Sequence, residues 1–113
     1  MLSRKYRLPA TTKLSHTRFL RTSLFGIKYA KNDLPVSRFA FVVKKSVDKR
    51  AVARNRIRRV FRSCIEELLE QIAPGYDMLF FLEKGIMEVM RKELFQELNR
   101  VFEIKGLLRK SNS

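Results

Sequence analysis

The sequence predicts an α+β fold, a two-layer α/β sandwich in which helices pack on a small mixed sheet in the order (α)-β-β-α-β-α. Three observations predict it. Two segments with alternating apolar residues come first, a long amphipathic helix joins them to a near-continuous apolar run, and a second amphipathic helix follows. The 113 residues suit one domain, 1–113, with a variable N-terminal segment at 1–22 and a tail at 109–113.

The N-terminal segment is polar and basic, and Pro9 interrupts any early helix because proline has no backbone N–H. Thr11 or Thr12 carries the hydroxyl of a helix N-cap. We therefore expect a short helix from these threonines through about Leu20.

Two strands are expected next, at 24–31 and 38–44. Alternate residues place apolar side chains on one face of each: Phe25, Ile27 and Tyr29 in the first, and Phe39, Phe41 and Val43 in the second. The connection from Asn32 to Pro35 has the residues of a turn. Because the connection is short, we expect the two strands to form an antiparallel hairpin.

A long helix is predicted from about Val52 to Ile72, after a basic loop at 44–50, and Pro74-Gly75 ends it. Apolar residues recur at helical spacing and form a single stripe: Ile57, Val60, Phe61, Cys64, Ile65, Leu68, Leu69 and Ile72.

Residues 76–83 are almost all apolar, which predicts a strand buried on both faces. A second helix is predicted at about 87–105, with Gly106 at its C-terminal cap. Its expected buried stripe is Met90, Leu94, Leu98, Val101 and Phe102.

Positive charge is concentrated in the first part of the chain. The formal net charge is +14, and residues 1–62 hold 18 Lys and Arg against two acids, whereas residues 63–113 hold seven against nine. An even spread would fit a merely soluble surface. This segregation indicates a surface that binds nucleic acid or another polyanion.

The sequence also indicates the compartment. Its single cysteine, Cys64, excludes an internal disulfide and fits a reducing environment, and Cys64 itself lies on an apolar stripe as a small core residue. No apolar run is long enough to span a membrane, and the basic N-terminus lacks the apolar stretch of a secretory signal. We expect a cytoplasmic protein with no membrane partner.

The first turns of the long helix carry five arginines. On a helical wheel, Arg58, Arg59, Arg62 and Asn55 form a polar strip beside the apolar stripe, and Arg56 lies on the opposite flank. Arg54 falls on the buried side, so it must point past the end of the sheet or into a groove. Guanidinium groups on a rigid helix match phosphate oxygens, which favours RNA or DNA contact over a merely solvated face.

The order of these residues is more specific than their charge. Arg-Asn-Arg at 54–56 is followed by arginines at 58 and 59, with Ala51 three residues before Arg54 and Lys45 six before Ala51. This pattern resembles the signature of the bacterial ribonuclease P protein. In that family a strand ends in a Ser-Lys-Lys-like stretch, and the following helix opens with Ala-Val-x-Arg-Asn-x-x-Lys/Arg-Arg.

The resemblance extends over residues 24–108, through the strand at 38–43, the Gly-x-Asp strand at 75–80 and the ending at 106–108. It departs from the family in two places. Lys44-Lys45-Ser46 stands where the family has Ser-Lys-Lys, and only Phe19-Leu20 stands near the aromatics of the family's N-terminal helix. That helix helps to form the family's leader cleft, so we expect a reduced cleft here.

The resemblance implies a ribosomal protein S5 domain 2-like fold and a role as the protein subunit of ribonuclease P. In this family the RNA subunit holds the catalytic Mg²⁺ and removes the 5′ leader of precursor tRNA, and the protein binds the RNA and the leader without binding a cofactor or DNA. The implied RNA-contact set is Lys45, Lys49, Arg50, Arg54, Asn55, Arg56, Arg58, Arg59 and Arg62. Candidates for stacking on leader bases from the sheet face opposite the core are Phe25, Tyr29, Phe39 and Phe41; the alternative for each is plain core.

The residues themselves agree with a non-catalytic protein. His16 is the single histidine, and no Ser/His/Asp set, Cys/His set or metal-spaced cluster is present in the sequence. The main alternative is a ribosomal or ribosome-associated structural RNA-binding protein. A helix-turn-helix DNA-binding protein and a nuclease with its own catalytic groups are weaker alternatives.

Overall fold

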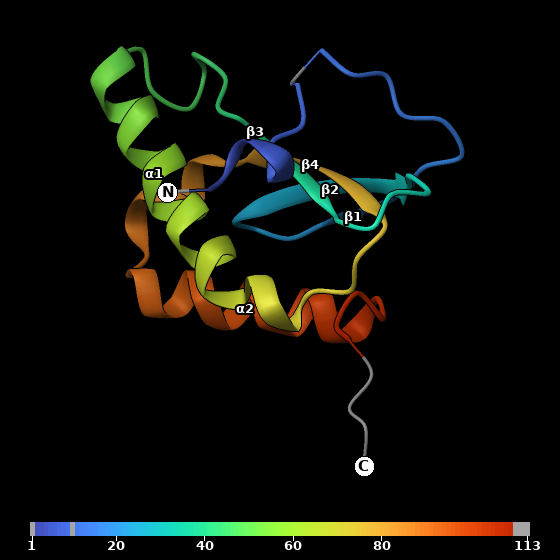
Figure 1. Ribbon diagram of the computed structural model, residues 1–113. Coiled ribbons are helices and arrows are strands. Elements are labelled where there is room, and N and C mark those ends of the chain that lie inside the picture. Colours follow the sequence, from blue (N-terminus) through green and yellow to red (C-terminus); the bar gives the residue numbers. More distant parts are fainter. Residues whose placement is uncertain (1, 10, 110–113) are drawn as a thin grey trace.

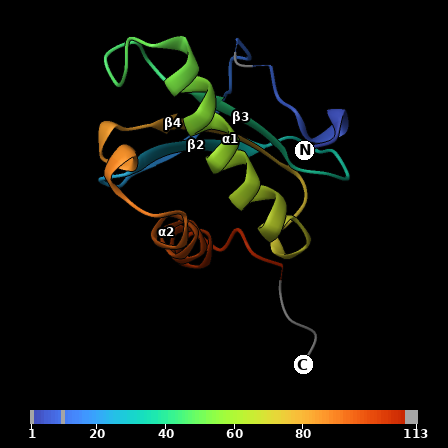
Figure 2. The same cartoon turned by 90° about the vertical axis from the view of Figure 1, so that its left-hand side faces the viewer.

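The computed structural model describes residues 2–9 and 11–109, and it has an α+β fold, as the sequence predicts. Two helices, α1 (Ala51–Leu68) and α2 (Arg91–Ile104), cover one face of a four-stranded sheet (Figure 1). Seen from the side, α1 crosses in front of the sheet while α2 appears end-on (Figure 2). The expected tail at 109–113 lies outside the described residues, except for Arg109.

The sheet has the strand order β1-β2-β4-β3. Its strands are β1 (Arg18–Arg21), β2 (Phe25–Lys31), β3 (Arg38–Val42) and β4 (Tyr76–Leu82). β1 and β4 are both antiparallel to β2, and β3 is parallel to β4. The sheet is therefore mixed, and β4 is one of its two central strands. The apolar run at 76–83 predicted a strand buried on both faces, and all of β4 except Tyr76 and Phe81 is buried.

The predicted hairpin of β2 and β3 is wrong, because β4 lies between them. In the register of the sheet, Phe80 of β4 pairs with Ile27 on one side and with Phe41 on the other. β4 is apolar on both faces, so its most favourable place is the centre of the sheet. The short connection after β2 follows turn chemistry as expected: Asp33 has a positive φ of 58°, and the Leu34 N–H donates to the Asn32 side chain at 2.8 Å.

The predicted N-terminal helix from Thr11 or Thr12 to Leu20 is also wrong. Residues 18–21 form β1, and the only helical element described before it is the short 3-10 turn η1 (Arg4–Tyr6). Thr22 stabilises the turn between β1 and β2, because its hydroxyl accepts hydrogen bonds from the N–H groups of Leu24 and Phe25, both at 3.1 Å. This tight turn folds residues 18–21 back along β2.

The core lies between the sheet and the two helices. Phe25, Phe61, Phe80 and Phe102 are fully buried there, and Phe61 and Phe80 have ring centroids 4.9 Å apart. Most of both predicted helix stripes is buried in this core. Ile57 and Leu69 are half-buried against it, and the exposed exceptions are Val60, which is 36% exposed, and Met90, which precedes α2 and is 72% exposed.

Cys64 is fully buried in the same core, as expected for a small core residue. Burial raises the pKa of its thiol, so the thiolate is disfavoured. The cysteine contributes packing rather than reactive chemistry.

The chain leaves each helix through a glycine. Gly75 and Gly106 have φ values of +91° and +66°, which favour glycine. Gly75 follows the 3-10 turn η2 (Leu69–Gln71), which extends α1. After Gly106, the Leu107 N–H donates to the Phe102 carbonyl at 2.8 Å, which is the bond of a Schellman cap. The predicted cap of α2 is confirmed.

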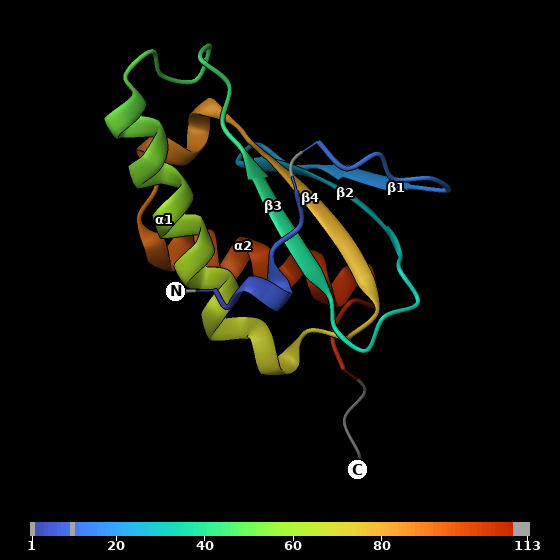
Figure 3. The ribbon, with the colours of Figure 1, turned by 45° about the horizontal axis from the view of Figure 1, so that its top comes forward.

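The opposite face of the sheet is partly covered by the N-terminal segment, which lies along β3 (Figure 3). The Leu8 N–H donates to the Phe39 carbonyl at 2.8 Å, and Leu8 packs with Ala40 and Leu79 in a small second cluster. The rest of this face, near β1, stays open.

Candidate nucleic-acid interface

The basic loop after β3 is a folded structure with its own contacts. Val47 packs against the core, and its N–H donates to the Lys44 carbonyl at 3.0 Å. Asp48 accepts bonds from the Arg50 backbone N–H at 2.8 Å and from its guanidinium at 3.1 and 2.9 Å. The Arg50 side-chain and backbone hydrogen bonds hold the pKa of Asp48 at about 2. The loop is therefore shaped before any partner binds.

Arg54 completes the loop. Its guanidinium donates to the carbonyl oxygens of Asp48 at 3.0 Å and Lys49 at 2.8 Å. Arg54 was expected to point past the end of the sheet or into a groove, and its side chain turns back onto the loop that precedes α1. These two hydrogen bonds hold the loop against the start of α1.

The predicted polar strip runs along α1 as expected. Arg58 donates to the Asn55 side-chain oxygen at 2.6 Å, and Arg59 is exposed beside them. One turn further on, the Arg62 guanidinium lies 5.7 Å from the centre of the Phe41 ring. The strip thus reaches from the start of α1 to the edge strand β3.

Several cations of this region have no partner among the described residues. Lys45, Lys49, Arg56 and Arg59 are exposed, and their side chains make no hydrogen bond or ion pair within residues 2–9 and 11–109. The first turn of α1 contains no acid, and Arg50 at its N-cap position makes no side-chain cap bond. Free backbone N–H groups and free cations at one helix end form a favourable site for phosphate oxygens.

The structure thus places the nine predicted RNA-contact residues in the basic loop and along the first two thirds of α1, and Figure 2 shows this loop and the start of α1 at one end of the molecule. The structure divides them into residues that shape the site and residues whose charge is unpaired. Arg50, Arg54, Asn55 and Arg58 make side-chain hydrogen bonds and Arg62 lies over the Phe41 ring, so these five belong to the first kind, and the four free cations belong to the second.

The four aromatic residues proposed for base stacking need correction. Phe25, Tyr29 and Phe39 are at most 4% exposed and lie in the core under the helices, so they are not available to stack on bases. Phe41 is half-buried and packs on Phe61 and Phe80. The predicted alternation within each strand is correct, but the face that it defines is the core face, which is the alternative given for each of these residues.

Two other aromatic residues lie on the open face of the sheet. Phe19 of β1 is 56% exposed, and Phe81 of β4 is partly exposed. Gly26 separates them, because it pairs with Phe81 and a side-chain carbon of Phe19 lies 3.2 Å from where a Cβ on Gly26 would stand. Strand alternation from Phe80 could have identified Phe81, whereas Phe19 was assigned to a helix.

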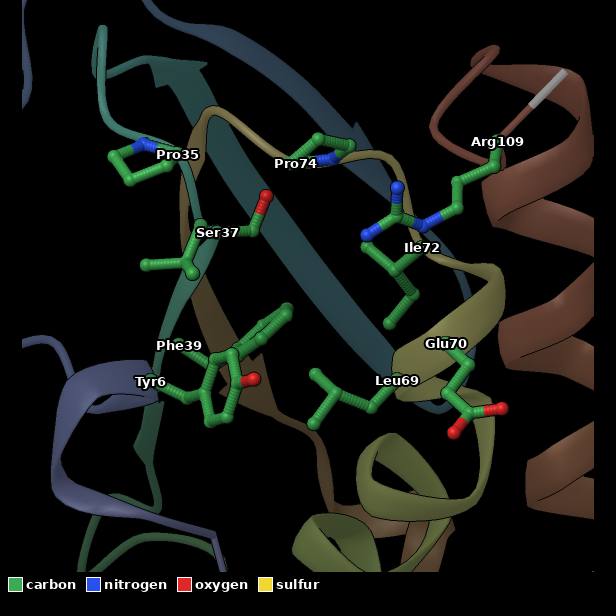
Figure 4. A pocket seen from close by; sticks show the side chains of 10 residues that line it. Tyr6, Pro35, Ser37, Phe39, Leu69, Glu70, Ile72, Pro74 and Arg109 are labelled. Atoms are coloured by element: carbon green, nitrogen blue, oxygen red, sulfur yellow. The ribbon is translucent and has the colours of Figure 1, made fainter.

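A pocket of about 230 Å³ at the other end of α1 has a different character (Figure 4). Tyr6 from η1 and Leu69 lie on either side of it, and Phe39 forms part of its wall. The hydroxyl of Ser37 is fully engaged, since it donates to the Ala73 carbonyl at 2.7 Å and accepts from the Tyr76 N–H at 3.0 Å. Around this pocket, the N-terminal segment packs against the body of the protein.

The described residues bring together no group of three His, Cys, Asp or Glu side chains that could hold a metal ion. In the same part of the chain, no helix is both long enough and apolar enough to cross a membrane.

Comparison with known proteins agrees with the fold and the motif. The model of the Ribonuclease P family matches residues 3–106. This chain belongs to the ribonuclease P protein family. The ribonuclease P protein component of Fusobacterium nucleatum is 39% identical over 80 residues, which cover 67% of this chain and 71% of the relative. That of Histophilus somni is 36% identical over 104 residues, covering 88% and 87%.

A solved ribonuclease P protein has the same fold. The structure of the Staphylococcus aureus protein matches with a TM-score of 0.72 and 18% identity, over 82% of this chain and 84% of that one. The family match includes the basic loop, the start of α1 and the N-terminal segment with β1, so it covers both the proposed RNA-contact residues and the open face of the sheet.

Proposed function

We propose that this chain is the protein subunit of ribonuclease P, part of an RNA–protein endoribonuclease. It binds the catalytic RNA and assists the Mg²⁺-dependent removal of the 5′ leader from precursor tRNA, while the RNA holds the Mg²⁺ and performs the chemistry. The observation that carries the proposal is the family match over residues 3–106, which contains the cation-rich loop and helix start.

In this proposal the RNA-contact residues have two roles: some bind phosphate and others hold the loop in place. The free cations Lys45, Lys49, Arg56 and Arg59 bind phosphate oxygens, because nothing within the described chain neutralises them. Arg54 and the Asp48–Arg50 pair hold the loop in place, so that little ordering is required when the RNA binds. Arg58 and Arg62 extend the same surface along α1.

The single-stranded leader binds, in this proposal, on the open face of the sheet. Phe19 and Phe81 provide aromatic surface, and Lys28 of β2 pairs in register with Phe19. β3 ends at Val42, which pairs with Phe81, and the basic loop follows directly. The basic loop therefore begins at the end of the strand beside Phe81, and aromatic stacking beside a basic surface is the usual way of holding single-stranded RNA.

Reconstitution tests the function. The chain is combined with its cognate ribonuclease P RNA, and 5′ cleavage of precursor tRNA is measured at low Mg²⁺ with and without the protein. We expect cleavage to require less Mg²⁺ when the protein is present. If the protein gives no stimulation but binds ribosomal RNA tightly, the ribosomal alternative replaces the proposal.

The leader contact is tested separately. Precursor tRNAs with leaders of different length are compared for affinity to the reconstituted enzyme. We expect the longer leaders to bind more tightly with the wild-type protein, and this gain to shrink with Phe19→Ala. A gain that is independent of Phe19 and Phe81 would place the leader elsewhere.

A further inference from the structure

A groove of about 520 Å³ lies on the flank of α1 away from the polar strip. One wall is the first half of α1, and the other is the 3-10 turn η3 (Lys84–Glu88) with the start of α2. Figure 2 shows η3 and the beginning of α2 beside this half of α1. The volume falls in the range typical of small-ligand pockets, although the groove is open on one side.

The groove is lined by apolar side chains that the core does not use. Val52 is 79% exposed, Met87 is 43% exposed and Val60 is 36% exposed, and all three line it. Met90, at 72% exposed, lies directly before α2. These are four of the seven large apolar residues that are exposed in the described chain. Apolar side chains grouped in this way around a hollow indicate a binding surface.

The charges around the groove favour an anionic occupant. Three arginines line it and no acid does. Asp48 holds Arg50, and Glu67 with Ser63 holds Arg91, so these two guanidiniums have fixed positions. Arg56 is exposed and has no partner among the described residues. The groove therefore combines an apolar floor with one free cation at its edge.

The place of the groove on α1 narrows the choice of occupant further. The groove and the polar strip lie on opposite flanks of the same basic helix start, so an RNA strand that contacts Arg58 and Arg59 is close to the groove. A flat group with apolar faces that is attached to a phosphate would satisfy the apolar floor and Arg56 together, and the base of an unpaired nucleotide is such a group. An ordinary apolar protein segment would leave Arg56 without a partner.

We infer that this groove receives an unpaired nucleobase of the ribonuclease P RNA, with the Arg56 guanidinium on the adjoining phosphate. This inference rests on the proposed function and adds to it a site for one extruded base. Val52 and Met87 contact the base from opposite walls. The contact is apolar and insensitive to which base is present, since each base offers a similar face.

The test uses the full chain and its cognate ribonuclease P RNA without precursor tRNA. The double variant V52N/M87N removes apolar surface and leaves the charge unchanged. Its matched control is Ile104→Asn, which changes a 60% exposed apolar residue at the far end of α2. We expect the double variant to bind roughly tenfold more weakly, in the lower part of the range for losing one stacked base, and the control to bind like wild type.

Salt dependence separates a base contact from a phosphate contact. The slope of log affinity against log salt is expected to stay the same for V52N/M87N and to become shallower by about one contact for Arg56→Ala. Chemical probing of the RNA completes the test. We expect one unpaired nucleotide or a few to be protected by wild type and the control, and to lose this protection with the double variant.

Three results would overturn the inference. The first is that V52N/M87N binds and protects the RNA as well as wild type does. The second is that the salt slope of V52N/M87N becomes shallower as its RNA affinity falls. The third is a binding defect that appears only when precursor tRNA is added. Thermal unfolding checks each variant, and Val52→Asn alone replaces the double variant if that one is unstable. If wild type itself does not bind the RNA, the proposed function fails first; if wild type binds and the double variant binds equally well, only the inference fails.

Discussion

Asp48 holds Arg50 through two contacts to its guanidinium and one to its backbone N–H, at 2.9, 3.1 and 2.8 Å. Asp48 is one of only two acids in the first 62 residues, and its charge offsets an arginine of the proposed RNA surface. An acid at this place reduces the positive charge, so its benefit must be geometric. It fixes the loop that leads into α1 and fixes one wall of the groove beside that helix.

The Asp48–Arg50 pair predicts a pH dependence at strongly acidic pH. The pKa of Asp48 is lowered from 3.8 to about 2, so its pair stabilises the loop at and above pH 4 and is lost as the pH falls towards 2. Between pH 5 and 8 we expect no change from this group. An NMR titration of the Asp48 carboxyl carbon measures the midpoint, and a midpoint at or above 3.8 would contradict the pair.

Removing Arg54 is expected to loosen the loop. Arg54→Ala leaves two carbonyl groups without their protein donor, and we expect a loss of stability on the order of 1 kcal/mol because both carbonyls can turn to water. Hydrogen exchange measures the effect at the Val47 amide, which is bonded to the Lys44 carbonyl. The exposed Arg59→Ala is the control, and equal exchange in both variants would show that Arg54 does not hold the loop.

The arginines of the polar strip on α1 are expected to act through phosphate contacts. The double variant R58A/R59A should leave the unfolding temperature close to that of wild type and make the salt dependence of RNA binding shallower by about two contacts. Fluorescence anisotropy with the cognate RNA at several salt concentrations measures the slope. An unchanged slope would remove both arginines from the interface, and a loss of folding would assign them to structure.

Phe19 and Phe25 form a matched pair for the open face and the core. Phe25→Ala opens a cavity under the helices and is expected to cost about 3–5 kcal/mol of folding stability. Phe19 is 56% exposed, so Phe19→Ala is expected to cost on the order of 1 kcal/mol or less and to weaken leader binding instead. Urea unfolding and leader affinity are measured for both, and the reverse pattern would refute the assignment of faces.

Local patterns in the sequence predicted the elements that carry the strongest periodicity. The stripe containing Phe61, Cys64 and Ile65 is buried as expected, and Gly106 caps α2 with a positive φ. The sequence also located the basic loop and the strip along α1, because charge and helical spacing are local properties. These features account for the part of the interface that the sequence could predict.

Such local patterns could not predict how the strands pair or that the N-terminal segment contains a strand. Pairing β3 with β4 depends on the path of the chain through α1, and no short-range signal in residues 32–37 distinguishes it from a hairpin. β1 has only four residues, too few to show alternation, and its turn depends on the single hydroxyl of Thr22. The groove beside α1 also joins segments about 30 residues apart, so no motif marks it.

Arg38 and Asp77 link β3 to β4 on the face opposite the helices, with two bonds of 2.9 and 2.7 Å, and Asn32 donates a third at 2.8 Å. Burial raises the pKa of Asp77, and the hydrogen bonds from Arg38 and Asn32 lower it by more, so the net pKa lies below its usual 3.8. Asp77→Asn is expected to cost about 3 kcal/mol, because Arg38 is left without its charge partner in a partly buried place.

The pair of Glu97 and Arg100 on α2 provides the control, because Arg100 is 55% exposed, and Glu97→Gln is expected to cost less stability than Asp77→Asn. Because the folded-state pKa of Asp77 is lowered, its contribution is present above pH 4 and declines as the pH falls below that value. Urea unfolding at pH 7 and at pH 3 should therefore show a smaller difference between wild type and Asp77→Asn at pH 3. An equal difference at both pH values would mean that the variant is destabilised by altered packing rather than by the lost charge.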